Sequence, residues 1–226
     1  MKSNYELLLK KSLPNGDFFL SDNSIEGYTG YGIEFTQLSS MYDFGNVIIN
    51  GNEIASSVAG ARAIIFPATT SNWVTSVLIT SNVLPNAQHG ILVNAGEYLT
   101  IANNTCLDID IGSAVTTGRV AGNTIQSGGS ITNSSTSVIV PYNPGYNPVG
   151  ASTISFSTSP NTYTAGASPE TLYLSDSSGI TALTDNGTSI LPHTTGANVV
   201  LTVDLGPFET AVITSGGTLT GKKMIH

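Results

Sequence analysis

Cysteine, positive charge and long apolar runs are all scarce in this sequence of 226 residues. The single cysteine, Cys106, excludes an intrachain disulfide, so the fold must be held by packing. Only seven residues are Lys or Arg and the net charge is −8, which argues against binding to nucleic acid or to an anionic membrane surface. The apolar run at 7–9 is too short for a signal peptide or a membrane span, and we expect neither.

Short apolar segments separated by Gly, Ser, Thr and Asn make up most of the chain. Hydrophobic residues account for 40% of the sequence and charged residues for 10%, and 24 positions are glycine. A disordered chain carries more charge and fewer apolar residues. The composition therefore predicts an all-β protein with many turns, in which Cys106 is a buried and unreactive thiol.

An asparagine recurs between two apolar positions, as in the segment VIINGNEI at 47–54. The recurrences are separated by 29, 30, 22 and 19 positions. In a parallel β-coil, equivalent residues stack about 4.8 Å apart, and stacked side-chain amides can hydrogen-bond in a ladder. We predict such a structural ladder from Asn23, Asn52, Asn82, Asn104 and Asn123.

A second apolar repeat lies between the asparagines and contains Ile33, Ile64, Ile91 and Ile109. Two interleaved strand motifs at a period of about 20–30 residues are typical of a solenoid. We therefore predict a right-handed parallel β-helix of about five rungs over residues 17–125. Ile48 and Leu78 should face outward, and another subunit or a long loop is expected to cover them.

The flanking segments differ in character from the repeat. Residues 1–16 should form either an N-terminal cap or the remainder of a longer coil, because terminal rungs expose unpaired strand edges. Residues 126–150 are of low complexity and end in three prolines, so we expect a linker or strap. Short strands separated by turns then predict an antiparallel β-sandwich over 151–226.

With its repeated asparagines, Pro/Gly strap and C-terminal segment, the chain resembles phage tailspike proteins of the capsular polysaccharide depolymerase kind. The most specific motifs are Tyr163-Thr164-Ala165-Gly166 and Pro207-Phe208-Glu209-Thr210. The resemblance implies a homotrimer whose pectate-lyase-like β-helix recognises and cuts a bacterial surface polysaccharide. It also implies a C-terminal domain that supports trimerisation and touches glycan. Such spikes are several hundred residues long, so this chain is expected to be a C-terminal part.

Asp108 and Asp110 are the strongest candidates for catalytic residues. They lie two residues apart on a predicted strand, which separates their Cα atoms by about 6.6 Å. Carboxyl groups about 6.5–9.5 Å apart suit an inverting glycosidase, in which one acts as acid and the other as base. The alternative is that both are solvated aspartates on a polar face.

Tyr31, Arg62 and His89 each precede an aligned isoleucine by two residues, so they should form one column. Such a column could contact a sugar, or Arg62 could instead pair with an acid. The only tryptophan, Trp73, lies in a predicted loop, where it would either stack on a sugar or pack against the coil. No spacing of ligands indicates a metal site, and no cofactor is expected.

The sequence thus favours the C-terminal region of a phage tailspike on the virion tail, with a bacterial surface polysaccharide and two further copies of the chain as partners. Cleavage by this region remains open, and a glycoside hydrolase is favoured over a lyase. One alternative is a non-catalytic module for trimerisation or carbohydrate binding. Another is a bacterial β-helix adhesin.

Overall fold

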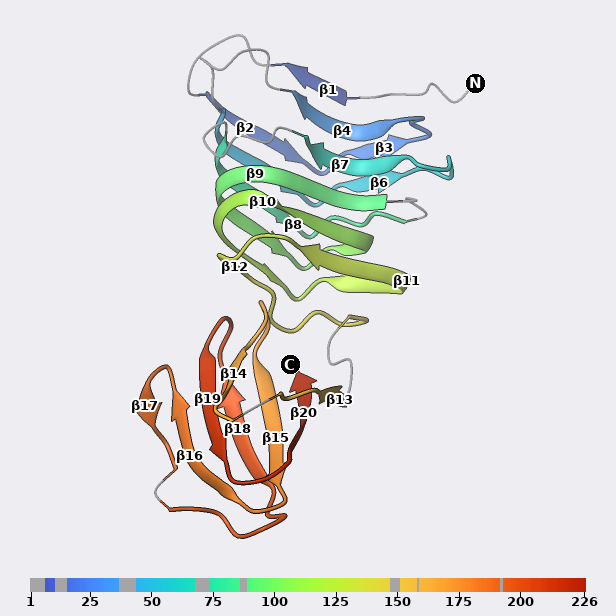
Figure 1. Ribbon diagram of the computed structural model, residues 1–226. Coiled ribbons are helices and arrows are strands. Elements are labelled where there is room, and N and C mark those ends of the chain that lie inside the picture. The colour runs from blue at the N-terminus through green and yellow to red at the C-terminus, as the bar shows by residue number, and fades with distance from the viewer. Residues whose placement is uncertain are drawn as a thin grey trace. The chain divides into compact units, whose positions relative to one another are not determined.

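The computed structural model describes residues 7–10, 16–36, 44–67, 74–85, 89–146, 151–157, 159–191 and 193–226. All regular secondary structure in these segments is β-strand (Figure 1). The described part of the chain has no helix of the length and apolarity needed to cross a membrane. The chain divides into two compact units, which are Met1–Ile139 with Asn143–Tyr146, and Val140–Tyr142 with Asn147–His226.

All strand pairs among the described residues of the first unit are parallel. Most of its strands belong to one ten-stranded sheet, and β3 and β6 form a separate parallel pair. The strands are β1 (Leu7–Lys10), β2 (Gly16–Ser21), β3 (Ser24–Glu26), β4 (Tyr31–Thr36), β5 (Phe44–Asn50), β6 (Glu53–Ala55), β7 (Arg62–Phe66), β8 (Val74–Thr80), β9 (His89–Ala102), β10 (Thr105–Ala121), β11 (Thr124–Asn133) and β12 (Val138–Ile139).

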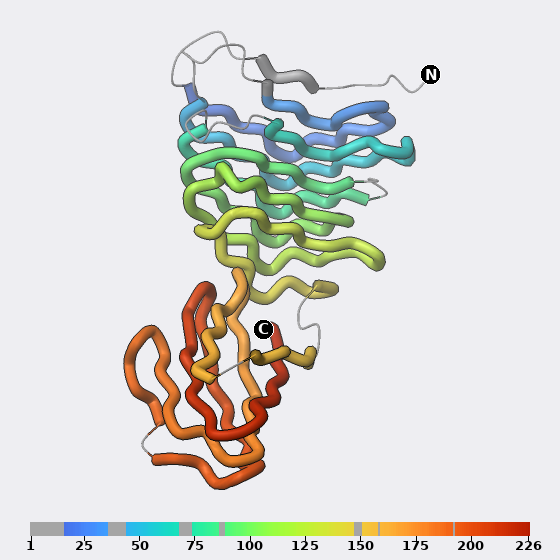
Figure 2. The backbone as a smooth tube through the Cα atoms, in the orientation of Figure 1, coloured from blue at the N-terminus to red at the C-terminus, as the bar shows by residue number. Residues whose placement is uncertain are grey.

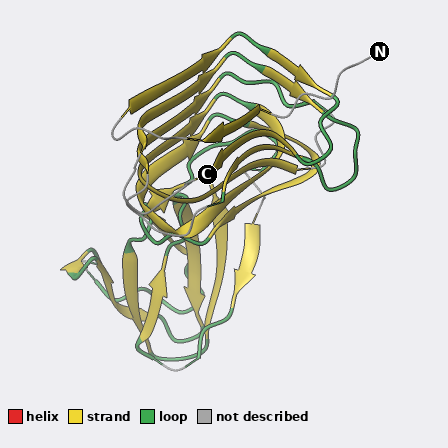
Figure 3. Cartoon of the chain, turned by 90° about the horizontal axis from the view of Figure 1, so that it is seen from above, coloured by secondary structure: helices red, strands yellow, loops and turns green. Residues whose placement is uncertain are grey.

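The aligned isoleucines occupy one file across this sheet. Ile33 pairs with Ile64, Ile64 with Ile91, and Ile91 with Ile109. Residues in register on neighbouring strands point to the same face of a sheet, and all four isoleucines are fully buried. Figures 2 and 3 show the successive parallel strands of this unit lying one over another.

Phenylalanines add a second set of core contacts at the N-terminal side of the first unit. The rings of Phe35 and Phe66 are stacked with centroids 4.4 Å apart, and Phe18 and Phe44 each meet Phe35 edge-on at 5.3 and 5.5 Å. Such offset and edge-to-face contacts stabilise a core beyond the burial of area alone. These four residues tie β2, β4, β5 and β7 together.

The repeated asparagines form a continuous hydrogen-bonded ladder. Each side-chain amide donates to the side-chain oxygen of the next asparagine, at 3.1 Å for Asn23 to Asn52 and at 2.9 Å for Asn52 to Asn82, Asn82 to Asn104 and Asn104 to Asn123. The backbone N–H of each donor residue reaches the same oxygen at 2.9–3.0 Å. The ladder satisfies polar groups that would otherwise be orphaned inside the unit.

The local backbone explains why the ladder residues follow small or polar residues. The residue before each of these five asparagines has a positive φ, which residues other than Gly, Asn and Asp rarely adopt. These residues are Asp22, Gly51, Ser81, Asn103 and Gly122, with φ of 57°, 68°, 57°, 57° and 69°. The bend turns the asparagine side chains into the stack. Four of them are accordingly at most 1% exposed: Asn52, Asn82, Asn104 and Asn123.

Residues 126–150, for which a linker or strap was predicted, instead continue the parallel sheet at 126–133 and 138–139. β11 and β12 both pair in parallel with β10, and Asn143 extends the ladder by accepting from the Asn123 side chain at 2.9 Å. The segment is needed there because it covers the edge of β10. At the other end, Leu7–Lys10 forms β1, which pairs in parallel with β4, so these residues extend the parallel sheet. Residues 1–6 and 11–15 lie outside the described residues.

Two four-stranded antiparallel sheets form the second unit, in the orders β13-β20-β15-β18 and β14-β19-β16-β17. Inward residues of both sheets share one buried cluster, to which Leu172 and Leu174 contribute from one sheet and Leu183 and Ile213 from the other. The strands are β13 (Ala151–Ile154), β14 (Asn161–Thr164), β15 (Glu170–Asp176), β16 (Ile180–Asp185), β17 (Thr188–Ser189), β18 (Leu201–Leu205), β19 (Thr210–Ser215) and β20 (Leu219–Ile225).

Candidate functional site

Four of the predicted site residues come together on the first unit. Arg62 begins β7 and His89 begins β9, and the register of the parallel strands places them side by side. Asp108 and Asp110 lie on β10, the next strand of the sheet. Because the three strands are adjacent and in register, a long side chain on β7 can cross β9 and reach β10.

Arg62 does reach both carboxylates. Its Nη2 lies 2.9 Å from Asp110 Oδ2 and its Nη1 lies 3.8 Å from Asp108 Oδ1. His89 Nδ1 is 3.0 Å from Asp108 Oδ2, and the backbone N–H of Gly90 donates to Asp108 Oδ1. The side chains of Arg62 and Asp108 are 14% exposed, whereas that of His89 is 45% exposed, so the cluster opens to solvent through the imidazole.

This arrangement favours an ion-pair network over an acid–base pair. An inverting mechanism needs a water between two carboxyl groups, but here one guanidinium contacts both of them. The pairing of Arg62 with acids was the alternative to sugar contact that the sequence left open. A fixed set of acceptors and donors of this kind is suited to binding hydroxyl groups. A catalytic role for Asp108 and Asp110 stays a prediction.

The thiol next to this cluster has no catalytic character. Cys106 is fully buried, and burial, followed by the negative charge of Asp108, raises the pKa of its thiol to about 12. The thiolate is the nucleophilic form of cysteine, and this environment suppresses it.

Two further predicted glycan contacts have different outcomes. Tyr31 begins β4 in register with Arg62 and is 38% exposed, so it is an accessible residue on the strand next to Arg62. Trp73 lies outside the described residues, and its two alternatives stay open. Among the residues that the structure does describe, no three His, Cys, Asp or Glu side chains are grouped to hold a metal ion.

The two motifs that carry the resemblance meet in the second unit. Thr164 pairs with Thr210 between β14 and β19, the Ala165 N–H donates to the Glu209 carbonyl at 2.8 Å, and the Phe208 N–H donates to the Gly166 carbonyl at 2.9 Å. Segments 40 or more residues apart are thus joined by backbone hydrogen bonds at one edge of a sheet.

A buried carboxylate anchors the same region. Glu170 is 2% exposed and accepts from the Tyr163 hydroxyl, from Lys223 Nζ at 3.1 Å and from the Gly166 N–H at 3.1 Å. Burial, followed by the hydrogen bond to Glu170, raises the pKa of Tyr163 to about 12. Burial by itself lowers the pKa of Lys223, but its hydrogen bonds to Tyr163 and Glu170 raise it overall. These contacts are those of a structural network.

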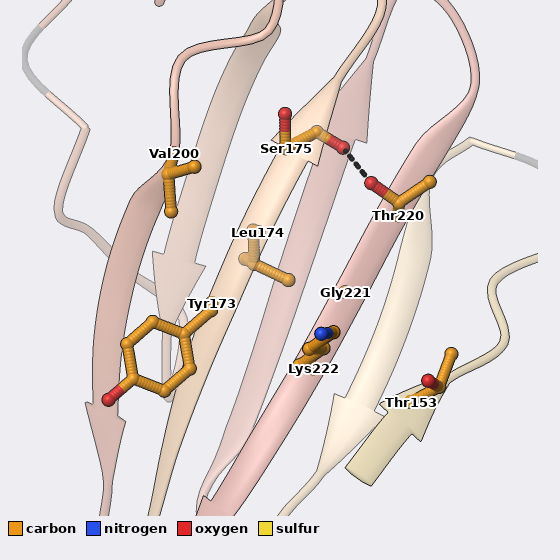
Figure 4. A pocket seen from close by; sticks show the side chains of 8 residues that line it. All are labelled: Thr153, Tyr173, Leu174, Ser175, Val200, Thr220, Gly221 and Lys222. Carbon is orange, nitrogen blue, oxygen red and sulfur yellow. Dashed lines mark hydrogen bonds between the residues drawn. The ribbon is translucent and has the colours of Figure 1, made fainter. Parts of the chain in front are cut away.

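The second unit also has a hollow of about 260 Å³ that the sequence did not predict (Figure 4). It lies along β15 and β20 and is lined by Thr153, Tyr173, Leu174, Ser175, Val200, Thr220, Gly221 and Lys222. The alternation in the segment ETLYLS at 170–175 could have indicated the outer face of this strand. It places Leu172 and Leu174 in the core and Tyr173 on the opposite face.

Comparison with known proteins identified no relative. No protein-family model, no curated protein and no solved structure matches the chain.

Proposed function

We propose that this chain is the C-terminal region of a phage tailspike, which recognises a capsular or other surface polysaccharide of the host bacterium and assembles as a trimer. In this proposal the first unit is a right-handed parallel β-helix and the second is a small β-sandwich. The observation that carries it is the buried asparagine ladder across parallel strands, followed in the chain by the antiparallel unit that holds the two tailspike-like motifs.

Glycan contact is assigned to the face that carries Tyr31, Arg62 and His89. The exposed ring of Tyr31 offers a surface for the apolar face of a sugar, and the neighbouring charged groups offer hydrogen bonds to its hydroxyls. Asp108 and Asp110 would hold Arg62 in position for such contact. The region would then act as a binding surface, whether or not it also cleaves the polymer.

Trimerisation is supported by apolar side chains on another face of the first unit. Phe19 is 64% exposed, and it pairs in register with Ile48, which pairs with Leu78. Tyr98, 60% exposed, lies on the adjacent strand β9. Ile48 and Leu78 are half-buried, and exposed aromatic rings beside such apolar side chains mark an interaction surface.

The proposal is tested by incubating the full chain with purified capsular polysaccharides and measuring both retention and new reducing ends. Binding that weakens at least fivefold in Tyr31→Ala supports the assigned face, and Thr181→Ala, an exposed change in the second unit, is the control. Retention without new reducing ends identifies a binding module, and new reducing ends that form without unsaturated sugars and are lost in Asp110→Asn identify a hydrolase. Failure to retain any capsular polysaccharide contradicts the proposal.

A further inference from the structure

The outer face of the sheet β13-β20-β15-β18 has an unusual composition for a surface. Tyr173 stands near its centre, directly across from Thr202 on β18 and from Lys222 on β20, and Lys222 is across from Thr153 on β13. Cross-strand neighbours of this kind have Cβ atoms about 4.5–5.5 Å apart. An aromatic ring is thus bordered on both sides by hydrogen-bonding side chains.

The face is hollowed at this place. The hollow of about 260 Å³ lies against Tyr173, Lys222 and Thr220, and Val200, which is 62% exposed, stands at its margin. In Figure 4, Tyr173 and Val200 lie on one side of the strand that carries Leu174, and Lys222 and Thr153 lie on the other. The volume is slightly below the range of about 300–1,000 Å³ typical of sites for drug-sized ligands. It therefore fits a single sugar ring better than a peptide segment.

Charge on this face points to an anion. The second unit contains two lysines and no arginine, and Lys223 is engaged by Glu170. Lys222, by contrast, is exposed and forms no ion pair with any residue that the structure describes. The nearest acid along β18, Asp204, accepts a hydrogen bond from Thr171 at 2.6 Å. An unpaired ammonium group beside an apolar hollow is available for a carboxylate.

We propose that this hollow binds one carboxylate-bearing sugar residue, a uronate, within the polysaccharide that the chain recognises. The ring of Tyr173 packs against the apolar face of the pyranose, and Lys222 pairs with the carboxylate. Thr153 can meet a sugar hydroxyl, and the Thr220 hydroxyl, which donates to the Ser175 carbonyl at 3.2 Å, can accept from one. This inference rests on the proposed recognition of polysaccharide, and it adds a site separate from the cluster around Arg62.

The test measures binding of the full chain to uronate polymers, namely polymers of galacturonate, glucuronate and mannuronate, and to their carboxyl-reduced neutral forms. Tyr173→Ala should weaken binding of the preferred uronate polymer about tenfold, because the stacking surface is lost. Lys222→Gln should weaken it about threefold to tenfold and leave binding of the reduced polymer unchanged. Lys222→Arg, which keeps the charge, should restore most of the affinity.

The outcomes separate this site from the proposed function. If a polymer binds but Tyr173→Ala and Lys222→Gln bind it as the unaltered chain does, the site in the second unit is refuted and recognition by the first unit stands. Preference for the reduced polymer also refutes it. If the unaltered chain retains no polysaccharide of any kind, the proposed function itself fails. Thr181→Ala, on the other sheet of the same unit, should have no effect in any assay.

Discussion

Replacing a single buried asparagine in the middle of the ladder should be costly. Asn82 is fully buried, and its Oδ1 accepts from the Nδ2 and the backbone N of Asn52 at 2.9 and 3.0 Å. Its own Nδ2 donates to Asn104 Oδ1 at 2.9 Å and to the carbonyls of Ile49 and Thr80 at 3.0 Å each. The change Asn82→Ala removes all five hydrogen bonds.

The size of the loss follows from which partners are left unpaired. The side chain of Asn52 keeps its bonds to the carbonyls of Leu20 and Asn50, and Asn104 Oδ1 keeps the backbone N–H of residue 82. The backbone N–H of Asn52 loses its acceptor, and an orphaned buried group costs about 1–3 kcal/mol. The carbonyls of Ile49 and Thr80 each lose one hydrogen bond as well. Together these losses should lower the free energy of unfolding of Asn82→Ala by about 3 kcal/mol.

Urea denaturation followed by circular dichroism, with hydrogen exchange of peptides from the first unit, measures this change. A loss of about 3 kcal/mol moves the midpoint by about 1–2 M urea. The matched control is Asn23→Ala, because Asn23 is exposed and water can replace its bonds to Asn52 Oδ1 and the Ser21 carbonyl. The control should cost less than about 1 kcal/mol. Equal losses in the two variants would refute the reasoning, since burial of the ladder would then have no energetic consequence.

Three further predictions concern pH, the thiol and the backbone. Burial and Glu170 raise the pKa of Tyr163 to about 12, so its contribution to stability is fully present below a pH of about 10 and is lost as the pH rises towards 12. The raised pKa of Lys223 acts in the same sense. The thermal unfolding temperature of the second unit should therefore fall in this pH range, and Tyr163→Phe should make that fall smaller. Cys106 should react with a thiol reagent at mildly alkaline pH only as fast as the first unit opens, and immediate reaction in the native protein would show that the thiol is not buried. Ser81→Gly should raise stability by up to about 1 kcal/mol because Ser81 has a φ of 57°, and a loss in urea denaturation would contradict this.

The register of the first unit was predictable because two local rules agree on it. Buried apolar residues must alternate with outward ones, and a stacked asparagine must meet another asparagine, so Ile64 is placed over Ile33 and Asn82 over Asn52 by independent constraints. A slip of one residue would break both. The handedness of the proposed coil is not encoded in this pattern, which is why it remains part of the proposal.

The parallel strands and the ladder residue beyond position 125 were not predicted, because the second half of the asparagine motif is absent there. Asn143 follows Val140 by the usual spacing, but Pro144 and Gly145 occupy the positions where the repeat has a free residue and a second apolar residue. The spacing from Asn123, 20 positions, was within the range of the earlier repeats. Prolines near the ladder predict a linker or strap, whereas the Pro144 carbonyl accepts a hydrogen bond from the Ile125 N–H at 2.7 Å.

The candidate sites show a different limit of sequence reasoning. The column of Tyr31, Arg62 and His89 was predictable from parity, and the register bears it out. The contact of Arg62 with Asp110 was not, because it depends on how a long side chain crosses the intervening strand β9. The hollow beside Tyr173 depends on the pairing of β15 with β20, whose residues are about 50 positions apart in the chain.

The proposed trimeric assembly is tested most directly by size-exclusion chromatography with light scattering on the full chain. The single chain has a mass of 23.4 kDa. The proposed spike predicts a species of about three times this mass, which persists on dilution because the exposed apolar groups around Phe19 and Tyr98 are buried between copies. A species with the mass of one chain at all concentrations contradicts it.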